Sequence, residues 1–165
     1  MTKAYLIQLT DYNIWANDIV CGWLKQISDE QWQQEIVSSF NSVQATVLHI
    51  ISAEHIWVQR MNMLENTEWL AASYKGTKEE HSVMWKQASE KLKKFVVDFD
   101  ENKLQGKFDF RRLNGELNTL LFYQAFAHVF NHSTYHRGQL ITMLRQVGFA
   151  EVGSTDMLGF FRNLN

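Results

Sequence analysis

Proline is absent from this 165-residue chain, although average usage would supply about eight. Because proline is the strongest breaker of helix interiors, its absence leaves long helices permitted along the whole sequence. The sequence also lacks repeats, low-complexity tracts and linker-like stretches. We therefore expect one helical domain, residues 1–165, large enough to bury a core without crosslinks.

Cysteine occurs once, as Cys21, which excludes an internal disulfide and a Cys-x-x-Cys site. A lone cysteine on an apolar helix is typical of a small buried side chain, and it fits a reducing compartment. No apolar run approaches the length of a membrane span, and Asp11 interrupts the N-terminal segment before it resembles a secretory signal. These observations predict a cytoplasmic protein with no membrane partner.

The sequence has no large excess of positive or negative charge, since 16 basic and 18 acidic residues leave a net charge of −2. This balance argues against a nucleic-acid partner. Glycine-rich phosphate loops, Gly-x-Ser-x-Gly and His-Glu-x-x-His do not occur, so nucleotide binding, a serine nucleophile and zincin chemistry have no motif here. Glu-x-x-His is absent too, which argues against a ferritin-like di-iron site.

Apolar residues recur at three- and four-residue steps in four segments, which predicts four amphipathic helices. The expected ranges are 2–26, 42–64, 77–98 and 118–147. Ser42 is the expected N-cap of the second helix and Gly148 the stop of the fourth. Capping boxes at 28–31 and 77–80 predict a short helix carrying Trp32 and the start of the third long helix.

Between the helices, residues 65–76 are expected to form a loop with Trp69 turned inward. Residues 107–113 followed by Asn114-Gly115 predict a small hairpin with a type I′ turn. A further short helical turn is expected after Ser154. The fold class predicted is all-α: a four-helix bundle with a small hairpin or loop insertion before the last helix.

The last helix is apolar on nearly all sides over residues 120–130, yet a line of polar side chains runs along it from 124 to 139. The line consists of Gln124, His128, His132, His136 and Gln139. Because burying polar groups costs on the order of 1–3 kcal/mol each unless they find partners, something must satisfy them. A divalent metal is one such partner.

Helix geometry limits which histidines share an ion. His128 and His136 lie ~12 Å apart along the axis, so a metal would take either of them together with His132, but not both. A third ligand must come from another helix. His49 lies in the most apolar part of the second helix, and His55 could sit at the rim. His81, in a charged first turn, is expected to face solvent.

The run Asn131-His-Ser-Thr-Tyr-His-Arg-Gly-Gln139 resembles the signature of the DinB/YfiT-like family of metal-dependent enzymes. Segments 12–17, 46–50, 53–57 and 154–156 also match. The resemblance implies a four-helix bundle of unusual helix order and a divalent metal held by His49, His132 and His136. It leaves His128 as a core residue or as a neighbour of the ligands. Gly138, inside the helix, suggests close approach by neighbouring backbone.

Three imidazoles suit zinc, nickel, iron or copper, and we favour zinc or nickel. The resemblance implies transfer of a low-molecular-weight thiol to an electrophilic small molecule. The alternatives are a metal-dependent hydrolase and a non-catalytic, stress-linked metal-binding protein. No carboxylate stands out as a general base, since Glu54 is expected to point away from the site. Tyr135 and Arg137 flank the ligands and are candidates for orienting a substrate.

A second copy of the chain is the last expected partner. The last helix is apolar around almost its whole girth between Leu120 and Phe130, and a four-helix core covers only part of that surface. A homodimer, as in members of the resembled family, would cover the rest. The hairpin and C-terminal tail are the alternative cover.

Overall fold

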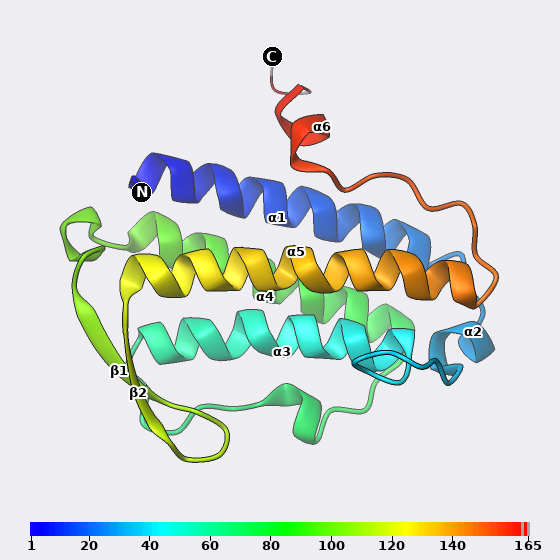
Figure 1. Cartoon of the computed structure of the whole chain (residues 1–165), viewed down its shortest axis with the longest axis horizontal. Helices are drawn as coiled ribbons and strands as arrows, with labels where there is room; N and C mark the ends of the chain where they lie inside the picture. Colours follow the sequence, from blue (N-terminus) through cyan, green and yellow to red (C-terminus); the bar gives the residue numbers. More distant parts are fainter. Residues whose placement is uncertain (163, 165) are drawn as a thin grey trace.

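The computed structural model describes residues 1–162 and 164, and four long helices dominate this part of the chain (Figure 1). They are α1 (Lys3–Leu24), α3 (Val43–Met61), α4 (Lys78–Asp98) and α5 (Phe122–Gln146). The shorter elements are α2 (Asp29–Gln33), η1 (Leu70–Ala72), η2 (Glu101–Lys103), the hairpin strands β1 (Lys107–Arg111) and β2 (Leu117–Leu121), and α6 (Met157–Arg162). The all-α bundle with a hairpin before the last long helix is confirmed. Within the described ranges, no helix has the length and apolarity that crossing a bilayer requires.

The order of the helices around the bundle differs from their order in the chain. α1 packs against α4 and α5, and α3 packs against the same two helices. Figure 1 shows that α1 and α5 run in one direction while α3 and α4 run in the other. Residues 62–77 therefore travel the length of the bundle to join α3 to α4. This arrangement leaves a groove between α3 and α5, which the site occupies.

The helix ends follow the capping signals of the sequence. Ser42 Oγ accepts a hydrogen bond from the Ala45 amide, and both predicted capping boxes form, with Ser28 and Thr77 as N-caps. Gly148 has φ +88°, the left-handed conformation that ends α5. These local signals need no tertiary partner, which is why the sequence predicts them well.

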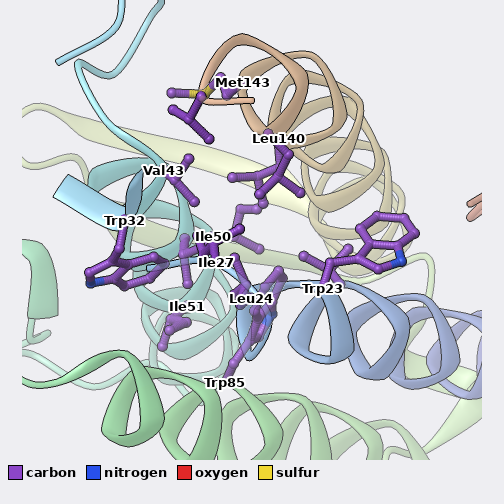
Figure 2. Packing of buried hydrophobic residues seen from close by; sticks show 14 of the residues in the cluster. Trp23, Leu24, Ile27, Trp32, Val43, Ile50, Ile51, Trp85, Leu140 and Met143 are labelled. Atoms are coloured by element: carbon purple, nitrogen blue, oxygen red, sulfur yellow. The ribbon is translucent and has the colours of Figure 1, made fainter. Parts of the chain in front are cut away.

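Two apolar clusters fill the bundle. The first gathers residues from five helices, and Figure 2 shows Trp23, Leu24, Ile27, Trp32, Val43, Ile50, Ile51, Trp85, Leu140 and Met143 packed together. The second surrounds the first half of α5, where Phe122, Phe126 and Phe130 are each at most 7% exposed. Leu104 and Phe108, from the segment before α5, belong to this second cluster. The chain's own elements therefore cover much of the apolar girth of α5.

The start of α5 and the hairpin turn differ from the prediction. Residues 118–121 belong to β2, because Asn118 pairs with Phe110 and Leu120 with Phe108, and α5 begins only at Phe122. In the turn, Gly115 has φ +86° whereas Asn114 does not have a positive φ. A type I′ turn needs both, so the loop 113–115 is instead a three-residue connection with its glycine in the left-handed region.

His81 was expected to face solvent, and this is wrong. Its side chain is fully buried, between the rings of Trp32 at 5.3 Å and Tyr74 at 5.0 Å. Its Nδ1–H donates to the Thr77 carbonyl over 2.8 Å. The charged neighbours on the first turn of α4 gave no sign that α2 and the 62–77 connection would cover it.

Candidate metal centre

Three histidines from two antiparallel helices meet in the groove between α3 and α5. His49 comes from α3, and His132 and His136 lie one turn apart on α5. One nitrogen from each lies within 4.8 Å of the others, and His49 Nε2 is 2.9 Å from His132 Nε2. The group therefore could hold a metal ion. Spacing had left two pairs open on the last helix, and the structure brings together the one containing His136.

The three imidazoles are held in the neutral form that binds metals. Burial, with His136 nearby, lowers the pKa of His49 to about 4. Burial is the largest cause that lowers the pKa of His132 to about 3, and the nearby imidazoles of His136, His49 and His128 lower it further by charge repulsion. Burial also lowers the pKa of His136, against a raising effect from Gln139. At pH 7 each ring offers a lone pair without first losing a proton.

Gln139 fixes the orientation of one candidate ligand. Its Oε1 accepts a 2.7 Å hydrogen bond from His136 Nδ1, which leaves the Nε2 lone pair of His136 free. The Gln139 amide nitrogen in turn donates to Ser39 Oγ at 3.0 Å and to Tyr135 Oη at 3.3 Å. Such outer contacts set the tautomer and ring orientation of metal-ligating histidines. The polar line on α5 therefore includes both a candidate ligand and its support.

The dimensions and donor set fit a divalent ion. Bonds of about 2.1 Å at tetrahedral angles would separate two nitrogens by roughly 3.4 Å, so the 2.9 Å pair needs only a small outward movement. Among the described residues, no cysteine or carboxylate belongs to this group. Three imidazoles are the donor set of catalytic zinc sites that keep a position open, whereas structural zinc sites usually close with four protein ligands.

Two aromatic side chains shield the group. The Phe40 ring stacks on His49 at 4.1 Å and lies 5.5 Å from His136, and Trp69 meets His49 edge-on at 5.5 Å. The segment carrying Trp69 is fastened to α3, because the Ala71 amide donates to Ser52 Oγ over 2.9 Å. Trp69 is half-buried, as the inward turn expected for it requires.

A cavity of about 610 Å³ opens beside the histidines, between α3, α5 and the hairpin. Its lining includes His49, Trp57, Arg60, Phe110, His128 and His132. His128 does not join the three-histidine group. Its exposed ring lies 4.9 Å from Trp57 and 5.6 Å from His132, on the cavity wall. It is therefore neither a candidate ligand nor a core residue.

Known proteins resemble this chain along most of its length. The sequence profile of the DinB family matches residues 1–162. The chain belongs to the DinB family. It is 27% identical over 153 residues to Protein DinB of Bacillus subtilis (strain 168), covering 88% of each protein.

Solved structures share the DinB fold. A DinB-like protein from Bacillus cereus ATCC 10987 superposes with a TM-score of 0.71 at 17% identity, covering 90% of this chain and 95% of that one. A DinB-like protein from Bacillus subtilis, YjoA, gives 0.68 at 15% identity, covering 90% and 98%. These likenesses support the fold of the whole bundle.

The remaining DinB motif residues form a second polar cluster, which the sequence did not predict. Glu54, on α3, is fully buried in the bundle centre, and its carboxylate accepts hydrogen bonds from side chains of the other three long helices. Asn13 Nδ2 (2.8 Å), Asn17 Nδ2 (3.1 Å) and Ser133 Oγ (3.3 Å) donate to Oε1, and Ser89 Oγ (2.7 Å) donates to Oε2. Glu54 thus points away from the histidines, as expected.

Arg137 lies on the other side of the same asparagines. It is 1% exposed, and its Nη1 donates to Asn13 Oδ1 at 2.6 Å and to Asn17 Oδ1 at 2.9 Å. Its guanidinium also lies over the Tyr12 ring at 5.3 Å. The two asparagine side chains therefore bridge a buried carboxylate and a buried guanidinium: their nitrogens donate to Glu54 and their oxygens accept from Arg137. Arg137 is part of this network and does not face the cavity.

The signal for this network was present in the sequence. Asn13 and Asn17 are four residues apart on the buried face of α1, among apolar neighbours such as Leu9 and Val20. Polar residues at core positions need partners, and the only buried charges facing them are Glu54 and Arg137 in the described structure.

The other singled-out residues lie outside the group. His55 is half-buried at the rim, with Nε2 3.4 Å from Glu68 Oε2. Tyr135 is 60% exposed, its ring lies 4.9 Å from that of His136, and its hydroxyl accepts a hydrogen bond from Gln139. Gly138 was expected to allow close backbone approach, and this is wrong, because a Cβ there would meet nothing within 4 Å.

Proposed function

We propose that this DinB-family chain is a metal-dependent enzyme that transfers a low-molecular-weight thiol to an electrophilic small molecule. His49, His132 and His136 hold one divalent ion, zinc or nickel. The observation that supports this proposal is the meeting of three neutral imidazoles, of which those of His49 and His132 line a cavity of about 610 Å³. A site buried for structure alone would have no need of such a space beside it.

When bound, a divalent ion lowers the pKa of a thiol so that the thiolate forms near neutral pH. The imidazoles stay neutral, and Gln139 keeps Nε2 of His136 directed to the centre. Phe40 and Trp69 keep water from one side of the site, while the cavity admits the electrophile. The thiol proton passes to solvent, the sulfur bonds to the electrophilic carbon, and the leaving group departs with the bonding electrons.

The thiol must come from outside the chain. Burial raises the pKa of Cys21 to about 11, against a lowering hydrogen bond from Ser82, so this side chain remains a thiol at neutral pH. Cys21 lies on α1, which contributes no residue to the cavity. A free small-molecule thiol therefore supplies the nucleophile.

The test compares thiols and variants. Metal-loaded protein is incubated with a panel of low-molecular-weight thiols and a chromogenic electrophile, alongside His49→Ala and the control His55→Ala. Thiol-dependent turnover that disappears in His49→Ala and persists in His55→Ala supports the proposal. Turnover of activated esters without thiol would indicate a hydrolase, and equal background rates in all proteins would indicate a non-catalytic metal-binding protein.

We also propose that the protein is cytoplasmic and forms a homodimer. The free Cys21 supports the first statement, since a reducing compartment suits an unpaired thiol. Light scattering tests the second. A dimer gives twice the chain mass of 19.4 kDa at micromolar concentration, and a value near 19.4 kDa would refute it.

A further inference from the structure

The cavity beside the histidines is also lined by an arginine that makes no salt bridge within the described structure. Arg60, on α3, is 8% exposed, and its Nε is buried with no hydrogen-bond partner among the described residues. Its guanidinium lies against two rings that touch each other, 5.0 Å from the centre of Trp57 and 5.1 Å from that of Phe110. The rings hold the guanidinium in place without satisfying its donors.

A second unsatisfied donor faces the same space. Asn118 pairs with Phe110 across the hairpin, so both side chains lie on one face of it. The Asn118 amide nitrogen is buried without a partner in the described part of the chain, and both residues line the cavity. Buried donors left unpaired cost free energy, and a ligand that pairs them recovers it.

The charge of the lining points to the same kind of ligand. Arg60 and Arg112 both line the cavity, and no aspartate or glutamate is among the described lining residues. Arg112 is paired with Glu116 over 3.1 Å on the surface, whereas Arg60 has no such partner in the described structure. The unpaired positive charge in the lining is therefore that of Arg60, which is 8% exposed.

We infer that Arg60 and Asn118 form a subsite for the carboxylate of a small-molecule ligand whose other end reaches His49 and His132. This inference rests on the proposed function for what happens at the histidine end, and names the substrate class: carboxylate-bearing small molecules. The planar guanidinium matches a carboxylate, which takes hydrogen bonds from the Arg60 guanidinium and the Asn118 side-chain amide.

The placement of the two ends sets the shape of the ligand. Eleven residues of helix separate His49 from Arg60, which places their Cα atoms roughly 16 Å apart along the axis. Helical side chains lean toward the N-terminus, so the Arg60 side chain shortens this span from its side. His128 and Trp57 form the wall between the two ends. An elongated ligand with an apolar middle fits this lining.

The subsite is tested first without metal, so that its outcome does not depend on catalysis. Metal-free protein is titrated with hexanoate and with 1-hexanol, and binding is followed by the NMR signals of the Arg60 Nε–H and the Asn118 side-chain amide. Hexanoate is expected to bind at least about tenfold more tightly than hexanol. Equal affinity for the two would overturn the inference.

Variants locate the effect. Arg60→Gln and Asn118→Asp should each remove the preference for hexanoate, Arg60→Lys should retain part of it, and Arg145→Gln, which removes an exposed charge on α5, should leave it intact. Loss of the preference in Arg145→Gln as well would refute the subsite. Asn118→Asp keeps the side-chain size, so it serves if Arg60→Gln fails to fold.

A second titration separates this inference from the proposed function. Cobalt-loaded protein is titrated with 6-mercaptohexanoate and 6-mercaptohexanol, and the thiolate-to-cobalt absorption band is recorded. A carboxylate preference in metal-free protein without any thiolate band sustains the subsite and refutes thiol activation. A thiolate band of equal strength and affinity for both probes refutes the subsite and sustains thiol activation.

Discussion

The bundle holds two polar clusters on neighbouring faces of α5, where Ser133 and Arg137 directly follow His132 and His136, and they are built in opposite ways. The cluster around Glu54 and Arg137 is nearly closed, with both charged groups at most 1% exposed and with members from all four long helices. The cluster of His49, His132 and His136 is open, since a cavity lies alongside His49 and His132. The difference indicates that the first cluster organises the bundle and the second awaits a ligand.

The largest effect should come from opening the closed cluster. Glu54→Gln removes the charge that faces Arg137 through Asn13 and Asn17, and leaves a buried guanidinium uncompensated. We expect a loss of about 3–5 kcal/mol in the free energy of unfolding, measured by urea denaturation. The double variant Glu54→Gln/Arg137→Met should recover part of it. A loss below about 1 kcal/mol would show that the two clusters do not differ in this way.

Removing one histidine from the open cluster should weaken metal binding without destabilising the fold. His132→Ala is expected to lower affinity for zinc or nickel by at least about 100-fold, since two imidazoles make a weak site. The melting temperature of the metal-free variant should stay close to that of the metal-free parent. His128→Ala is the matched control and should keep full metal content in elemental analysis. Metal retention in His132→Ala would contradict the assignment of the ligands.

A smaller effect is expected one contact away from the ligands. Gln139→Ala removes the acceptor that fixes the tautomer of His136, and metal affinity should fall by about 10–100-fold. Gln139→Glu supplies another acceptor and should retain the affinity. Calorimetric titration of metal-free protein measures both. If Gln139→Ala bound metal with the affinity of the parent protein, the hydrogen bond between His136 and Gln139 would not contribute to metal binding.

The smallest effect is expected at Gly138, a position on α5 that belongs to neither cluster. Gly138→Ala adds a methyl group in open space within a helix, so it should stabilise the protein by about 1 kcal/mol, or roughly 2–4 °C in melting temperature. Gly22→Ala, in equally open space on α1, is the matched comparison. Destabilisation at position 138 alone would show that a neighbour approaches it closely.

What the sequence predicted well was local. The caps at Ser28, Ser42 and Thr77 and the stop at Gly148 each depend on residues within one turn. The start of α5 was misplaced because residues 118–121 gain partners only when 107–110 fold beside them. His81 was misjudged for a similar reason, since Trp32 and Tyr74 reach it from distant segments.

In the candidate site, too, the sequence predicted the local features and missed the contacts between distant segments. Helical spacing limited the ligands on α5 to two pairs, and only the family resemblance chose His132 with His136. The cavity depends on hairpin residues such as Phe110 and Asn118 packing over α3, and no periodicity in the sequence indicates that contact. The Glu54 network was within reach, because two asparagines on an apolar helix face require partners.

The network around Glu54 also bears on how the chain chooses one topology. Each long helix contributes polar atoms to it: Asn13 and Asn17 from α1, Glu54 from α3, Ser89 from α4, and Ser133 and Arg137 from α5. Apolar contacts tolerate sliding, but a slip of one turn, 5.4 Å, would part every donor from its acceptor. The network therefore fixes the axial register of the bundle, because only one alignment of the four helices satisfies all of its hydrogen bonds.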